Sequence, residues 1–155
     1  MNARQIGTAV LMLCAFAPVP SLSADDLILY EGPSVRIEVT PNALKQVEQV
    51  AEYDDPLSTT PSRLVTITKD AVLTTRAFEE LASDIQETGF FSLGEQYGVS
   101  DSAAAYPYTI SVRYRNKAKT VIFRSGGEAT QRPVAFANAQ DRIMKFAKRI
   151  TARAR

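Results

Sequence analysis

The segment TRAFEELASDIQETGFF, residues 75–91, decides the fold of this 155-residue chain. Its apolar side chains recur at helical spacing, so we predict an amphipathic helix from about residue 76 to residue 88. Thr75 is the candidate N-cap, and Glu79 and Glu80 are expected near the positive end of the helix dipole. Gly89 is expected to end the helix in a left-handed conformation. The predicted centre of the core consists of Phe78, Leu81, Ile85 and Phe91.

On the C-terminal side of this helix, two segments predict a β-hairpin. Residues 108–115 alternate apolar and polar side chains, which is typical of a strand with one buried face. Residues 119–124 form the returning strand, after a short turn at residues 115–118. Pro133 then indicates the start of a last helix, from about residue 134 to residue 151. The inner face predicted for this helix carries Phe136, Gln140, Ile143, Ala147 and Ile150, with Met144 and Phe146 beside it.

On the N-terminal side, residues 26–30 and 35–39 are rich in apolar or β-branched side chains and predict two strands. Residues 31–34, which include Gly32 and Pro33, form the turn between them. Further along, residues 63–68 predict another strand, and Lys69 and Asp70 suggest that a turn follows it.

Residues 43–53 allow two interpretations. Leu44, Val47, Val50 and Ala51 fit one face of a helix, and Thr40 followed by Pro41 is a plausible helix start, so propensity slightly favours a helix. The same Thr-Pro-Asn-Ala sequence is also a turn, which would fold the segment back on the preceding strand as a hairpin. Residues 54–62 are then a surface loop.

The order of these elements predicts the fold class. Strands, a helix, a hairpin and a second helix indicate an α+β fold, with an antiparallel sheet and two helices packed on one face. Residues 25–155 have the length of a single domain with one core.

The first 24 residues predict a secretory signal peptide. Arg4 supplies a charged start, residues 6–16 an uncharged apolar run, and residues 18–24 an exit rich in small side chains. The apolar run is shorter than the roughly 20 residues that span a bilayer. We therefore expect cleavage after Ala24 or Ser23, and a periplasmic or secreted location. Leu13 before Cys14 argues against lipid attachment at that cysteine.

The composition restricts the chemistry available to the mature chain. The sequence contains no histidine, and its single cysteine, Cys14, lies in the predicted signal peptide. Ser-His-Asp and Cys-His catalysis, zinc sites of the usual kind and disulfides are therefore excluded. We expect a protein that is not an enzyme and that has no cofactor. The alternative is a hydrolase based on carboxylates, which requires two acidic side chains converging in a cleft.

The charge distribution argues against nucleic acid as a partner. The whole chain carries 18 basic and 17 acidic residues, and without Arg4 the two signs balance. A nucleic-acid-binding protein needs a basic excess. Residues 141–155 are nonetheless basic, which is typical of the solvated outer face and C-terminal end of a helix. A second possibility is an envelope-associated structural protein held at a membrane by this helix.

Several short motifs carry a family resemblance. They are FEEL at residues 78–81, GFFSL at 89–93, Tyr97, Asp101, YTISV at 108–112, KTV at 119–121, and Pro133. This pattern resembles a widespread uncharacterised exported bacterial family and is more distantly similar to emfourin-type inhibitors of thermolysin-like metalloproteases. The resemblance implies a hairpin at residues 36–53. It also implies a protein as the binding partner, and the similarity to emfourin-type inhibitors implies a protease.

These observations predict an exported, non-enzymatic domain that binds another protein, with protease inhibition as the specific version. A regular scaffold leaves its loops free for binding, so residues 31–34, 94–106 and 125–131 are the expected contact segments. Tyrosine combines a large apolar ring with a polar tip and is favoured at interfaces. The candidate partner-binding residues are Tyr97, Asp101, Tyr106, Gly126 and Gly127.

Overall fold

The computed structural model describes residues 25–55, 57, 59–98, 106–125 and 131–153. The predicted signal peptide, residues 1–24, lies outside them. In chain order the elements are β1 (Leu27–Glu31), β2 (Val35–Val39), β3 (Ala43–Glu52), β4 (Arg63–Val72), α1 (Thr75–Glu87), the 3-10 turn η1 (Phe90–Ser92), β5 (Gln96–Gly98), β6 (Tyr106–Tyr114), β7 (Lys117–Ser125) and α2 (Val134–Arg153).

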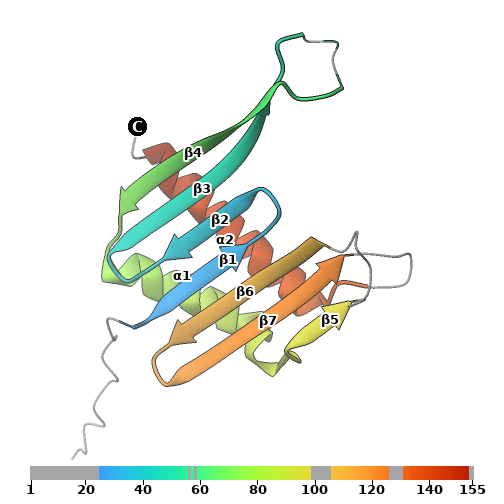
Figure 1. Ribbon diagram of the computed structural model, residues 1–155. Coiled ribbons are helices and arrows are strands. Elements are labelled where there is room, and N and C mark those ends of the chain that lie inside the picture. Colours follow the sequence, from blue (N-terminus) through green and yellow to red (C-terminus); the bar gives the residue numbers. More distant parts are fainter. Residues whose placement is uncertain (1–24, 56, 58, 99–105, 126–130, 154–155) are drawn as a thin grey trace, which may run out of the picture.

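The described strands form one seven-stranded sheet in the order β4-β3-β2-β1-β6-β7-β5. Both helices lie on the same face of this sheet, and α2 runs across the strands (Figure 1). The predicted α+β class and the placement of two helices on one face are therefore confirmed. The sheet is mixed rather than purely antiparallel, because the short strand β5 pairs parallel with β7.

The core lies between the sheet and the two helices. Alternation along the strands turns every second side chain toward the helices. In β1 these are Ile28 and Tyr30, which lie opposite Val112 and Ile110 of β6. α1 and α2 cover them with a continuous apolar layer. The helix residues buried in this layer are Phe78, Leu81, Ala82, Ile85, Phe136, Ala139, Ile143, Phe146 and Ala147.

The slight preference for a helix at residues 43–53 was wrong, and the hairpin alternative was right. The segment is strand β3, which pairs with β2 on one side and with β4 over ten residues on the other. Leu44 and Gln46 are buried, which is a period of two rather than the helical spacing. Pairing on both sides outweighs the modest helix propensity of these residues.

The predicted turn at Lys69 and Asp70 was also wrong. Both residues lie inside β4, which continues without interruption from Arg63 to Val72. Lys69 faces Gln46 across the ladder, and its ammonium group lies 2.9 Å from a carboxylate oxygen of Glu48. The adjacent charges of Lys69 and Asp70 suggested a turn. Their strand conformation comes from pairing with β3, which lies about 20 residues earlier in the sequence and supplies Glu48.

The helix at the centre of the prediction is confirmed, with corrections at its start and after its end. The N-cap is Thr74 and not Thr75. The Thr74 hydroxyl accepts a hydrogen bond from the N–H of Ala77. Glu79 and Glu80 lie beyond the first turn. Gly89 takes the predicted left-handed conformation, with φ of 82°.

The second correction concerns the aromatic pair after Gly89. Phe90 is fully buried, whereas Phe91 is only partly buried and packs edge-on against Phe90, with ring centroids 5.9 Å apart. The 3-10 turn reverses the chain there and gives the core position to Phe90.

The last helix also differs from its predicted inner face. Phe136, Ile143 and Ala147 are buried as expected, but Gln140 and Ile150 are only partly buried. Phe146 is a core residue rather than a flanking one. None of the helices in the described ranges is long and apolar enough to cross a membrane.

Candidate functional site

The described parts of the three predicted contact segments border one end of the sheet. β1 ends at Glu31 and pairs there with Thr109 of β6, while Tyr106 at the start of β6 pairs with Ser125 at the end of β7. Gly98 at the end of β5 pairs with Arg124. We call this end, formed by residues 31–34, Gly98, Tyr106, Ser125 and Arg132, the loop end. It lies on the right of the sheet in Figure 1.

Arg132 forms the centre of an aromatic cluster at the loop end. Its guanidinium carbon lies 4.8 Å from the centroid of the Tyr108 ring and 4.9 Å from that of Phe123. Pro133 restricts the preceding residue to extended backbone, which fixes the direction from which Arg132 approaches the sheet. A guanidinium over aromatic faces is attracted by their quadrupoles. The contact therefore orders Arg132 in the segment before α2.

A chain of hydrogen bonds links Arg132 to the interior. Its Nη1 donates to Oε1 of Gln140 at 2.8 Å, and Nε2 of Gln140 donates to the Tyr30 hydroxyl at 2.9 Å. Tyr30 is only 2% exposed. Burial is the main cause that raises the pKa of Tyr30, and Tyr108 raises it further, while Arg132 and the Gln140 hydrogen bond act in the opposite direction. The phenol is therefore held as a neutral group between β1 and α2.

The turn between β1 and β2 rests on this network. A Cβ on Gly32 would lie 2.8 Å from the Tyr30 hydroxyl oxygen, so the backbone of the turn approaches the phenol closely. The N–H of Gly32 donates to the carbonyl of Val35 at 2.8 Å and closes the turn. Residues 31–34 are thus positioned by Tyr30 as well as by their own turn geometry.

Tyr106 is the exposed aromatic side chain of the loop end. It lies two residues before Tyr108 on β6, so both face the helix side of the sheet. Tyr108 is partly covered by Arg132, whereas Tyr106 is 61% exposed. An exposed tyrosine ring thus lies two residues along β6 from the tyrosine on which Arg132 stacks.

The other predicted site residues have different settings. Tyr97 on β5 is partly buried against the core, and its hydroxyl accepts the N–H of Gly94 at 2.7 Å. Asp101, Gly126 and Gly127 lie outside the described residues. Sequence reasoning missed Arg132, Tyr30 and Gln140. Gln140 could have pointed to this network. It is a polar residue on a helix face predicted to be buried, and a buried polar group needs a hydrogen-bond partner.

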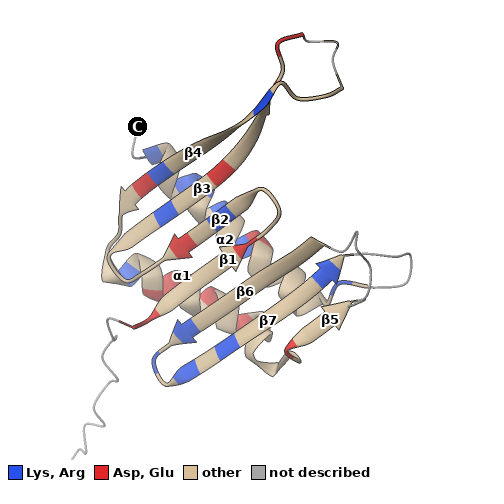
Figure 2. Cartoon of the chain, in the orientation of Figure 1, with Lys and Arg blue, Asp and Glu red and all other residues tan. Residues whose placement is uncertain are grey.

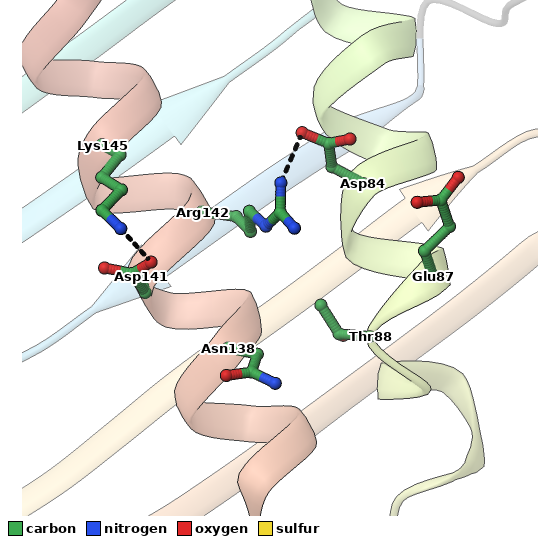
Figure 3. A pocket seen from close by; sticks show the side chains of 7 residues that line it. All are labelled: Asp84, Glu87, Thr88, Asn138, Asp141, Arg142 and Lys145. Atoms are coloured by element: carbon green, nitrogen blue, oxygen red, sulfur yellow. Dashed lines mark hydrogen bonds and ion pairs between the residues drawn. The ribbon is translucent and has the colours of Figure 1, made fainter.

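A groove of about 600 Å³ between α1 and α2 bears on the hydrolase alternative. Figure 3 shows its acidic side chains: Asp84 pairs with Arg142 across the groove, Asp141 pairs with Lys145 along α2, and Glu87 points away from α2. The Asp84 and Asp141 side chains are about half exposed. A carboxylic acid used as a catalytic proton donor is usually kept neutral by an apolar pocket. These two are instead solvated members of ion pairs.

The basic residues of α2 are partly occupied within the molecule. Arg142 and Lys145 form the ion pairs just described, and the Arg149 guanidinium lies 5.4 Å from the Phe146 ring centroid. Further basic residues lie along the C-terminal part of α2, near β4 (Figure 2). In the described part of the chain, no group of three or more acidic residues is placed to hold a metal ion.

Comparisons of the chain with protein-family models, with curated protein sequences and with solved structures gave no match.

Proposed function

We propose that this chain is an exported, non-enzymatic domain that binds a protein partner at the loop end. The proposal is carried by the position of exposed Tyr106, which lies two residues along β6 from Tyr108, the ring on which Arg132 stacks. Tyrosine and arginine are enriched among the residues that contribute most to protein interfaces. An arginine already fixed by Tyr108 and Gln140 loses little conformational entropy on binding, which favours affinity.

The scaffold around the loop end supports the same proposal. One end of each of the strands β1, β5, β6 and β7 lies there. The hydrogen bonds from Arg132 through Gln140 to Tyr30 join α2 to the sheet. Binding residues on loops held by a rigid scaffold are a common arrangement. The partner would thus meet described residues that these strand pairings and hydrogen bonds hold in place.

Inhibition of a thermolysin-like metalloprotease is the specific version of this proposal. It rests on the resemblance carried by the motifs at residues 78–81, 89–93 and 108–112. A titration of such a protease with the purified chain tests it. Absence of inhibition removes this version and leaves a binding domain with another protein partner.

The binding proposal itself is tested by affinity capture from a periplasmic extract, with the tagged chain as bait. Tyr106→Ala is compared with Asn116→Ala, which changes an exposed residue at the opposite end of the same hairpin. We expect Tyr106→Ala to weaken the retained protein's affinity roughly 30-fold, the effect of losing about 2 kcal/mol at a central interface residue. Equal retention by both variants contradicts the proposal.

A further inference from the structure

The two edges of the sheet differ sharply. Within the part of the chain that the structure describes, β5 forms one edge and β4 the other. β5 is three residues long, whereas β4 has ten residues in unbroken register with β3. Short edge strands, bulges and prolines are the usual protections against pairing with another chain. β5 has the first of these. β4 is long, unbroken and free of proline, and its charged residues are Arg63, Lys69 and Asp70.

The register identifies the backbone groups that β4 presents outward. The N–H of Leu73 donates to the carbonyl of Asn42 at 2.9 Å, at the point where the ladder between β3 and β4 continues beyond Val72. In an antiparallel ladder, every second residue bonds to the partner strand, and the residues between them point away. Counting back from Leu73, the odd-numbered residues of β4 bond to β3. The outward residues are Leu64, Thr66, Thr68, Asp70 and Val72.

The side chains along this edge are suited to contact with another strand. Leu64 is 65% exposed and Val72 is 92% exposed, although both are apolar. The charged residues of β4 lie toward its ends, and the stretch between them is uncharged (Figure 2). Lys69, which would otherwise discourage pairing, faces the helix side and is held by Glu48.

We propose that β4 pairs antiparallel with β4 of a second copy of this chain, about a two-fold axis at Thr68. In this register, each of the five outward residues of one copy lies opposite an outward residue of the other copy. Thr68 meets Thr68 of the second copy, Thr66 meets Asp70, and Leu64 meets Val72. The two seven-stranded sheets then join into one continuous sheet.

The cross-strand pairs of this register are chemically complementary. Leu64 and Val72 cover each other, so two exposed apolar side chains leave water at each end of the interface. The Thr66 hydroxyl is placed to donate to the Asp70 carboxylate, and no like charges face each other. This interface is independent of the loop end, whose residues lie on β1, β6, β7 and the segment before α2.

The register can be tested by disulfide formation. Cys14 is replaced by Ser, so that an introduced cysteine is the only one in the chain. Directly opposed residues of a hydrogen-bonded antiparallel pair, as Thr68 and its copy would be, have Cα atoms about 5.5 Å apart, which a disulfide can bridge. Thr68→Cys should therefore form a disulfide-linked dimer under mild oxidation. In the control Thr66→Cys, the two cysteines would lie roughly 14 Å apart along the strands and should not be linked.

A second measurement tests the contact without a cysteine. Sedimentation of the unmodified chain should show a dimer, with enough salt to screen the basic ends of α2. Val72→Lys should weaken dimerisation at least about ten-fold, because it places a charge against Leu64. The matched control Val134→Lys changes an equally apolar residue, 75% exposed, at the start of α2, and should have no effect. A monomeric chain, or equal cross-linking of Thr68→Cys and Thr66→Cys, overturns the proposal.

Discussion

Arg132 stacks on Tyr108, with 4.8 Å between the guanidinium carbon and the ring centroid, and thereby joins the segment before α2 to β6. The two residues are 24 positions apart in sequence and belong to different layers of the fold. The free tyrosine of the proposed site, Tyr106, lies two residues from Tyr108 on the same strand. This contact therefore adds to the strand pairings that hold the loop end.

Replacing Arg132 should loosen the loop end. Arg132→Ala removes the stack and the hydrogen bond to Gln140, so we expect the free energy of unfolding to fall by about 1–2 kcal/mol. Arg132→Lys should recover little of this, because an ammonium group lacks the planar face and the fork of donors. Urea denaturation of the three proteins measures the effect. Full recovery by Arg132→Lys would show that charge alone is sufficient.

The pKa of Tyr30 predicts a dependence of stability on alkaline pH. Burial raises this pKa, so the folded chain retains a proton that the unfolded chain releases at about pH 10. The contribution of Tyr30 to stability is complete below that pH and is lost as the pH rises toward the folded-state pKa. Tyr30→Phe should show a shallower loss of stability above pH 10 than the unmodified chain. Identical slopes for the two proteins would contradict a buried, neutral phenol.

The two phenylalanines after Gly89 should differ in their contribution to stability. Phe90 is fully buried, so Phe90→Ala should cost about 3–5 kcal/mol through lost burial and a cavity. Phe91 is partly exposed, and Phe91→Ala should cost no more than about 1–2 kcal/mol. Chemical denaturation of both variants gives the comparison. A larger loss for Phe91→Ala would mean that the assignment of the core residue is wrong.

Gly94 and Gly98, on either side of Tyr97, should respond differently to replacement by alanine. Gly98 has φ of 97°, and a Cβ there would lie 2.1 Å from the carbonyl oxygen of Arg124. Gly98→Ala should therefore separate β5 from β7 and cost more than about 1 kcal/mol. A Cβ on Gly94 would lie 3.4 Å from the Tyr97 hydroxyl oxygen, which is ordinary contact, so Gly94→Ala should change stability by less than about 0.5 kcal/mol. Thermal unfolding of the two variants distinguishes them, and equal destabilisation would contradict the geometry of β5.

The elements predicted correctly from the sequence are those with a strong local pattern. α1 has an unbroken apolar stripe and a glycine stop, and the hairpin of β6 and β7 alternates regularly around a short turn. β3 was predicted only as the hairpin alternative to a slightly favoured helix, because its residues have no strong preference and its pairing with β2 and β4 decides its conformation. β5 is three residues long and depends on β7 for its existence, so it has no pattern of its own.

The candidate site was only partly visible in the sequence. Tyr106 was selected because exposed tyrosines are typical of interfaces, and the structure places it in the open at the loop end. The network behind it joins Tyr30, Tyr108, Arg132 and Gln140, which are spread over 111 positions of the chain. Contacts over such separations follow from the strand order, and that order was not predicted.

The central claim, that the loop end contacts a protein partner, is tested most directly by photo-cross-linking in the living host. A photoreactive phenylalanine is introduced at residue 106, and in a matched protein at residue 116, which is exposed at the other end of the same hairpin. We predict one discrete cross-linked species heavier than the chain at residue 106 and none at residue 116. No cross-link at residue 106, or the same species from both positions, would contradict the account.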